Sequence, residues 1–274
     1  MTKQQISTLS LAFQPVTRIV GGGVLSLGDW FLFVFETVRW IFRKPYRFGN
    51  IVRQMEFIGV KSTPIIVLTG LFVGAVFALQ TGKAFALFCA ESLVGATIGL
   101  SLAREIGPVF TALMVTARAC SAMAAEIGTM RVTEQIDALE TMAVDPIHYL
   151  VVPRVISSTL MTPLLTGIFN LIGIIGAYFV GVHLLQISEG SFFDRLCYYV
   201  DVNDFVGGLV KAAVFGFFIS VISCYQGYVT KGGAEGVGRS TTNAVVVSSV
   251  TVLVMDYFLT TWILEFFNTT SGGV

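Results

Sequence analysis

Charged side chains lie within stretches of this sequence that are otherwise apolar enough to cross a membrane. They include Arg104, Glu105, Arg118, Lys211 and Asp256. A charge inside a bilayer is expensive, so an ionisable residue at that depth marks a candidate functional site. Lys211 and Asp256 could pair across helices, and Arg104 and Arg118, 14 residues apart, could share one helix face. Two interpretations follow: a structural ion pair that fixes helix register, or a polar spot in an apolar cavity that holds the head group of an amphiphile such as a phospholipid.

The sequence offers no pattern for catalysis or metal binding. No HExxH motif is present, and neither His148 nor His183 has a partner at metal-ligand spacing. Residues 233–240 resemble a phosphate-binding loop, but Arg239 replaces the lysine and a membrane span precedes the segment, so we interpret it as a glycine-rich turn. The four scattered cysteines are interpreted as small packing residues. We therefore expect no cofactor, metal or catalytic residue in this chain.

The elements that carry these charges are predicted to be transmembrane helices. Of the residues, 54% are hydrophobic and 12% are charged, whereas soluble domains carry about 25% charged residues. We expect five spans, over 64–79, 93–127, 155–187, 205–229 and 244–263. Span one contains a GxxxG pattern at Gly70 and Gly74, which favours close helix approach, and Gly107-Pro108 predicts a kink in span two.

The segment before the first span mixes aromatic and basic residues. Its apolar run, 30–35, is too short to cross a membrane, and Trp30 and Trp40 lie among arginines and lysines. This composition is typical of an amphipathic helix on the bilayer surface, with a short tilted first span as the alternative. The predicted fold is an all-α integral membrane protein with an N-terminal interfacial helix, over 1–62, and a five-span domain over 63–265.

Orientation follows from the distribution of lysine and arginine. Twelve lie before span one or in the loops after spans two and four, two lie on the opposite side, and three lie within spans. By the positive-inside rule, the N-terminus and the 128–154 loop are cytoplasmic and the C-terminus faces outward. The first residues lack the pattern of a signal or transit peptide, which favours a bacterial inner-membrane protein.

A short charged helix is predicted over 129–143, in the loop after span two. Val132, Ile136, Leu139 and Ala143 would form one apolar stripe, and the Asp145-Pro146 pair would end the helix. A neighbouring acidic row consists of Glu134, Asp137 and Glu140. The helix could rest on lipid or dock onto a protein, and the acidic row favours a basic protein over an anionic leaflet.

Three segments resemble a known family. They are the stretch from Leu102 to Arg154 (LAREIGPVFTALMVTARACSAMAAEIGTMRVTEQIDALETMAVDPIHYLVVPR), residues 70–80 (GLFVGAVFALQ) and residues 227–260 (GYVTKGGAEGVGRSTTNAVVVSSVTVLVMDYFLT). These resemble the MlaE/YrbE permeases, the membrane subunits of Mce-type lipid ABC transporters. The resemblance implies a homodimer whose interfacial elbow helix precedes five spans in each subunit.

The resemblance also implies partners and a cargo. A separate ATPase (MlaF-like), which would bind ATP and Mg, would receive the coupling helix through Arg131, Glu134, Gln135, Asp137 and Glu140. A periplasmic Mce-domain ring protein (MlaD-like) and a STAS-domain protein (MlaB-like) would complete the assembly, without nucleic acid. The cargo would be a glycerophospholipid moved between the inner and outer membranes.

The lipid cavity is placed by the same resemblance. Arg104, Glu105 and Lys211 match positions near the cavity, and Phe77, Phe85 and Phe88 match its apolar lining and mouth. Three alternatives stand beside this interpretation: another lipid such as a sterol, a channel or passive scaffold, and an intramembrane enzyme. The enzyme is disfavoured because no histidine lies near a serine or threonine by spacing.

Overall fold

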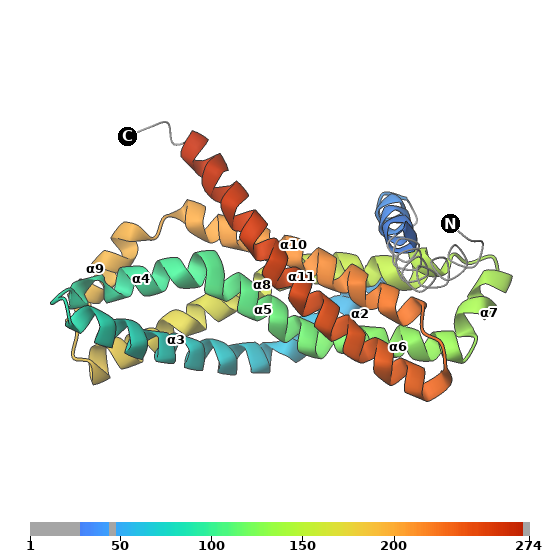
Figure 1. The fold of residues 1–274 in the computed structure, drawn as a ribbon, viewed down its shortest axis with the longest axis horizontal. Coiled ribbons are helices and arrows are strands. Elements are labelled where there is room, and N and C mark those ends of the chain that lie inside the picture. The colour runs from blue at the N-terminus through green and yellow to red at the C-terminus, as the bar shows by residue number, and fades with distance from the viewer. Residues whose placement is uncertain (1–27, 44–47, 271–274) are drawn as a thin grey trace, which may run out of the picture. The chain divides into compact units, whose positions relative to one another are not determined.

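The computed structural model describes residues 28–43 and 48–270 (Figure 1). The chain divides into two units, Met1–Pro45 and Tyr46–Val274. The described part of the first unit is a helix over 28–41, in which the Thr37 hydroxyl donates a hydrogen bond to the Phe33 carbonyl oxygen at 2.8 Å. A helix was predicted here. Its place on the membrane surface stays a prediction, and residues 44–47 lie outside the described part of the chain.

Five helical runs of the second unit are long and apolar enough to cross a membrane, as predicted. They are Phe48–Ala86, Glu91–Val132, Ile147–Leu184, Val202–Tyr228 and Gly233–Ile263. The residues that the structure describes contain no strand, so the all-α fold is confirmed for them. Each run is longer than the apolar stretch that predicted it or begins before it, because helical hydrogen bonding continues into polar sequence.

The first run joins α2 (Phe48–Ile58), the short turn η1 (Val60–Ser62) and α3 (Thr63–Ala86). A proline in the first turn of α3 suits that position, because the first amides of a helix have no partner within it. Helix α3 packs along α8 (Val152–Tyr178) at the glycines of the GxxxG pattern. A methyl group on Gly74 would overlap the carbonyl oxygen of Gly173, and one on Gly70 would lie 3.0 Å from the carbonyl oxygen of Phe169. The predicted close approach is therefore confirmed, between two helices of one chain.

The second run is a continuous helix with two wide turns. It comprises η2 (Glu91–Leu93), α4 (Val94–Ser101), η3 (Leu102–Ile106), α5 (Gly107–Val115), η4 (Thr116–Cys120) and α6 (Ser121–Val132). Turns η3 and η4 are π-helical, with hydrogen bonds between residues five apart. η3 ends directly before the Gly107-Pro108 pair, so the irregularity predicted there takes the form of a widened turn.

Helix α10 (Val202–Tyr228) lies at the centre of the second unit, since it packs against α8, α6 and α11. Its start is fixed by a capping box, in which the Asp201 carboxylate accepts from the Val202 amide at 2.9 Å and Asp204 accepts from the Asp201 amide at 3.1 Å. α10 contributes Phe215 and Ile219 to the shared apolar core.

The last helix differs from the prediction. The last helix, α11, spans Gly233–Thr270 and crosses α10 obliquely (Figure 1), so the segment interpreted as a glycine-rich turn is already helical. The turn itself is confined to Gly232 and Gly233, whose φ angles are 94° and 68°. A methyl group on Gly236 would overlap the Lys231 carbonyl oxygen. Gly236 therefore allows the first turn of α11 to pack closely against the turn that connects it to α10.

The helix predicted over 129–143 is also wrong as a single element. α6 continues to Val132, and a separate helix, α7, covers Gln135–Thr141. Glu134 has a left-handed φ of 58° and breaks the two apart. The predicted apolar stripe is reduced to Ile136, which is fully buried, because the break rotates Val132 away from the residues of α7.

The connections on either side of span three complete the described chain. Asp145 does not end α7; its carboxylate accepts from the Ile147 and His148 amides, at 2.9 and 3.2 Å, and so caps η5 (Ile147–Val151). Beyond α8, η6 (Phe179–Leu184) leads to α9 (Glu189–Tyr199). α9 lies at the opposite end of the second unit from α7 (Figure 1). Among the cysteines, Cys120 and Cys224 are buried as predicted for packing residues, whereas Cys89 and Cys197 are exposed.

Candidate functional site

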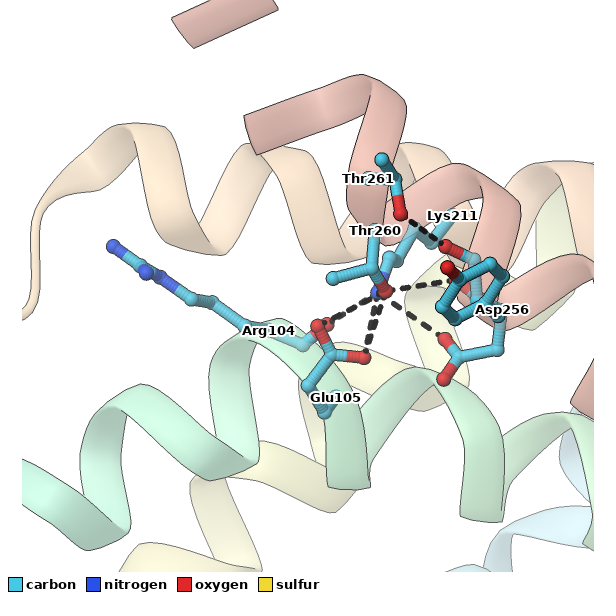
Figure 2. Close-up of polar contacts among 7 residues, drawn as sticks. Arg104, Glu105, Lys211, Asp256, Thr260 and Thr261 are labelled. Atoms are coloured by element: carbon cyan, nitrogen blue, oxygen red, sulfur yellow. Dashed lines mark hydrogen bonds and ion pairs between the residues drawn. The ribbon is translucent and has the colours of Figure 1, made fainter. Parts of the chain in front are cut away.

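Three helices bring one lysine and two carboxylates together. The Lys211 ammonium, on α10, lies 2.7 Å from Glu105 Oε2 in η3 and 3.1 Å from Asp256 Oδ1 in α11. It also donates to the Thr260 hydroxyl at 2.6 Å and to the Arg104 carbonyl oxygen at 3.2 Å (Figure 2). The predicted pairing of Lys211 with Asp256 is confirmed, and Glu105 and Thr260 join it. We call Glu105, Lys211, Asp256 and Thr260 the lysine cluster.

The side chains of the lysine cluster differ in their exposure to solvent. The Lys211 side chain is 3% exposed, whereas the Glu105 side chain is 39% exposed. An ammonium has three protons to donate, and four acceptors surround this one, so its hydrogen bonding is saturated from within the protein. The Glu105 carboxylate is therefore the most accessible charged group of the cluster, which holds two carboxylates and one ammonium.

Arg104 turns away from its neighbour Glu105. Its guanidinium Nη2 lies 2.7 Å from Asp204 Oδ1, and Nε donates to the same oxygen at 2.8 Å. Asp204 is also the residue that closes the capping box of α10. The sequence reasoning missed this partner, although an Asp-x-x-Asp spacing before an apolar run is the signal that could have found it. Because 45% of the Arg104 side chain is exposed, a cation stands open beside the lysine cluster.

Arg118 has other neighbours. Its Nη1 donates to the Phe57 carbonyl oxygen at 2.8 Å and to the Ser62 hydroxyl at 2.9 Å, and its guanidinium lies 5.1 Å from the Phe57 ring centroid. Arg104 contacts the start of α10 instead, so the shared face expected for the two arginines is not formed. The π-helical turns that hold them alter the helical spacing on which that expectation rested.

An apolar groove is lined by the residue that follows Glu105 in the sequence. Ile106 follows Glu105 in η3 and lines this groove, whose volume is about 420 Å³, together with Phe77 and Phe110. The remaining lining comes from α3: Phe72, Val73, Val76 and Gln80. Grooves of this size and lining suit hydrocarbon, and the neighbouring charges suit a polar head, so the pair of features fits an amphiphile.

The other two predicted phenylalanines lie away from that groove, at the end of α3. Phe85 is partly buried against the core, and its carbonyl oxygen accepts from the Phe88 amide at 3.0 Å. The Phe88 side chain is 77% exposed. The structure thus places Phe77 in the apolar groove with Ile106, and Phe85 and Phe88 at the end of the span.

The five residues predicted for coupling gather at the α6–α7 connection. Arg131, in the last turn of α6, pairs with Asp137 at 2.6 Å, and its guanidinium lies 5.7 Å from the Tyr228 ring centroid. The Tyr228 hydroxyl in turn donates to Glu140 at 3.4 Å. Glu134 occupies the left-handed turn and Gln135 begins α7. Residues 134, 135, 137 and 140 are all exposed, so α7 presents an acidic surface held in place by Arg131 and Tyr228.

No group of three histidine, cysteine, aspartate or glutamate side chains among the described residues is arranged to hold a metal ion. The lysine cluster contains two carboxylates and a threonine, but the ammonium occupies the position between them. The cluster is therefore suited to binding and to fixing helices.

Known proteins align with most of this sequence. The sequence profile of the family described as Permease MlaE matches residues 51–262. A probable ABC transporter permease protein of Rickettsia felis is 48% identical over 235 residues, which cover 86% of this chain and 91% of that relative. The intermembrane phospholipid transport system permease protein MlaE of Haemophilus influenzae is 41% identical over 214 residues, or 78% of this chain and 82% of that relative.

A relative is also found in a plant. The Arabidopsis thaliana protein TRIGALACTOSYLDIACYLGLYCEROL 1, chloroplastic, is 37% identical over 230 residues, which cover 84% of this chain and 66% of that relative. The profile match covers the five membrane-grade helices, the lysine cluster and the α6–α7 connection. This chain is a multi-pass membrane protein that belongs to the MlaE permease family.

Proposed function

We propose that this chain is the membrane-spanning subunit of an ABC transporter that moves glycerophospholipids between the inner and outer membranes of a bacterium. The observation that carries the proposal is the apolar groove at Phe77 and Ile106, in which Ile106 belongs to the same turn, η3, as the charged Arg104 and Glu105. The printed name of the Haemophilus influenzae relative supports the choice of cargo. The chain supplies the path, and a separate cytoplasmic ATPase that binds ATP and Mg supplies the energy.

Both ends of a phospholipid find a counterpart at this site. Acyl chains would lie along the aromatic and aliphatic residues of α3 and α5, where no charge must be desolvated. A zwitterionic head group carries a phosphate and an ammonium, which would contact the partly exposed Arg104 guanidinium and Glu105 carboxylate respectively. A sterol carries neither a phosphate nor an ammonium to interact with these charges, so a phospholipid suits the site better.

A second copy of the chain would close the groove. The groove is open on one side, and large apolar side chains of α3 and α11 are exposed, among them Phe72, Val76, Leu253 and Phe258. An exposed apolar face of a membrane helix is covered by lipid or by another helix. We therefore propose a homodimer, with N-termini in the cytoplasm, C-termini in the periplasm, and an Mce-domain ring protein at the α9 end. A STAS-domain protein would act through the ATPase.

The ATPase is proposed to bind the acidic surface of α7. We expect Glu134→Lys to lower the amount of ATPase that co-purifies with the chain by more than about tenfold, since like charges brought together at an interface cost several kcal/mol. Glu134 is suited to this test because it is exposed and already tolerates its left-handed backbone. Co-purification from native membranes, followed by quantitative mass spectrometry of proteins and lipids, measures both the ATPase and the bound lipid.

Asp194→Lys supplies the matched control. It makes the same reversal of charge on an exposed acidic residue, but on α9 at the opposite end of the second unit. The control should leave ATPase recovery unchanged. Normal recovery of the ATPase with Glu134→Lys would argue against docking at α7, and a chain recovered with no phospholipid beyond the bulk membrane composition would argue against the cargo.

A further inference from the structure

A second cavity, of about 460 Å³, lies where α2 meets α6 and the start of α8. Its polar lining includes Arg53, Gln54, Lys61, Glu126 and Arg154. α6 leads into the α7 segment and η5 leads out of it, so this α2 cavity opens near the same end of the second unit as α7. Glu126 lies about 30 Å along the helix from Glu105 at 1.5 Å per residue, so the α2 cavity is separate from the lysine cluster.

Arg154 is the side chain that makes this cavity unusual. It is 4% exposed, and its guanidinium pairs with Glu126 at 2.9 Å and donates to the Leu150 carbonyl oxygen at 2.8 Å. Its Nε is buried and has no hydrogen-bond partner in the structure. A buried charged donor without an acceptor is costly, so an acceptor supplied from outside the chain would stabilise it.

Gln54 offers the complementary group. Its Oε1 is a buried acceptor, also without a partner, and the residue lines the same cavity. A ligand that satisfies both orphan atoms needs an acceptor for Arg154 and a hydrogen-bond donor for Gln54. A phosphate ester that carries a hydroxyl-bearing alcohol provides the two within one small group.

The charges around the cavity favour an anion. Arg154 and Glu126 pair with each other, which leaves two cations, Arg53 and Lys61, against one carboxylate, Glu56, in the lining. Behind the cavity wall, the Arg118 guanidinium holds the Phe57 carbonyl oxygen, and the Lys61 ammonium lies 5.6 Å from the Phe57 ring centroid. Four cations therefore surround the junction of α2 and α3.

The position of the α2 cavity favours a membrane lipid as the source of the phosphate. It lies at the ends of candidate spans, where α2 turns into α3 and η5 begins span three. Basic pockets between membrane helices near the cytoplasmic surface bind the head groups of anionic lipids. Exposed apolar residues of the same segment, Val52 and Val60, would lie against the acyl region.

We propose that the α2 cavity binds the phosphoglycerol head group of an anionic lipid from the adjoining leaflet. The phosphate accepts from Arg154 Nε and from Arg53 and Lys61, and a glycerol hydroxyl donates to Gln54 Oε1. The lipid ties α2 to α6 and α8, so it acts as a bound structural ligand of the permease. This inference requires only that the chain lies in a membrane and does not depend on the transported cargo.

The test compares lipids and variants on the purified full-length chain in phosphate-free buffer. Native mass spectrometry counts retained lipids, and thermal unfolding measures their effect, with phosphatidylglycerol, phosphatidylcholine, diacylglycerol and inorganic phosphate as probes. We expect phosphatidylglycerol to be retained and to raise Tm more than phosphatidylcholine or diacylglycerol does. Arg53→Gln and Lys61→Gln should each weaken its binding about fivefold, since each cation near an anionic group contributes modestly.

Exposed residues carry the test because Arg154→Gln would leave Glu126 unpaired and could prevent folding. Lys83→Gln is the matched control: it removes an exposed lysine from the other end of α3 and should leave phosphatidylglycerol binding unchanged. Stabilisation by inorganic phosphate alone, lost in the same two variants, would keep the phosphate site but assign it to a soluble anion. Equal effects of all lipids, or phosphatidylglycerol binding that Arg53→Gln and Lys61→Gln leave intact, would overturn the proposal.

Discussion

Lys211→Met is expected to lower the free energy of unfolding by about 3–5 kcal/mol, because it leaves two carboxylates close together without their cation. The Lys211 side chain is 3% exposed and its ammonium bridges Glu105 and Asp256, so its loss removes the cation that both carboxylates share. Thermal unfolding of the purified chain, followed by circular dichroism, measures the change. Lipid transfer by the reconstituted transporter should fall with it, since η3, α10 and α11 lose their common contact.

Two companion variants separate charge from packing. Lys211→Met combined with Glu105→Gln removes one of the stranded charges and should recover part of the lost stability. Lys83→Met makes the same substitution at an exposed position and should be close to neutral. An unfolding temperature unchanged by Lys211→Met would show that the lysine cluster does not hold the helices together.

Gly74→Ala is expected to cost more than a typical overpacking substitution, which is about 1–3 kcal/mol. A methyl group there would overlap the backbone carbonyl of Gly173, and a backbone cannot rotate away as a side chain can. The whole interface between α3 and α8 would have to separate, so we expect a chain that folds poorly. The yield of monodisperse protein in detergent and its unfolding temperature are the measurements.

Gly238→Ala is the control for the same chemical change. Gly238 lies within α11, and nothing stands within 4 Å of the added methyl group. Alanine there should stabilise the helix by up to about 1 kcal/mol, because glycine is the poorer helix former. If both variants behaved alike, the close approach of α3 and α8 at Gly74 would be contradicted.

Much of the fold was predictable because membrane-spanning helices are recognisable in the sequence as long apolar stretches. Each of the five apolar stretches became a helix, and the pair of Lys211 with Asp256 followed from two isolated charges at comparable depth. The GxxxG spacing likewise predicted a tight contact, although not its partner helix. These features depend on the cost of charge and of lost packing in hydrocarbon, which sequence alone conveys.

The details that escaped prediction depend on backbone geometry. Nothing in the residue types of 129–143 announces the left-handed Glu134, because a glutamate at that φ is held there by the packing of Ile136 and the pair of Arg131 with Asp137. The sequence did not reveal the partner of Arg104, because Asp204 precedes the span predicted over 205–229, whereas in the structure it closes the first turn of α10. Such contacts form between segments that only the folded chain brings together.

The π-helical turns η3 and η4 bear on how one part of the second run can rotate about the helix axis relative to another part. A π-helical turn holds a surplus residue relative to an α-helical turn. Shedding that residue would rotate one part of the helix against the other by about 100° and change its length by only about 1.5 Å. Glu105 lies within η3, and α7 follows the far end of the same run, with η4 between them. The distance from the α6–α7 connection to the lysine cluster would thus stay nearly constant, while the angle between them about the helix axis would change.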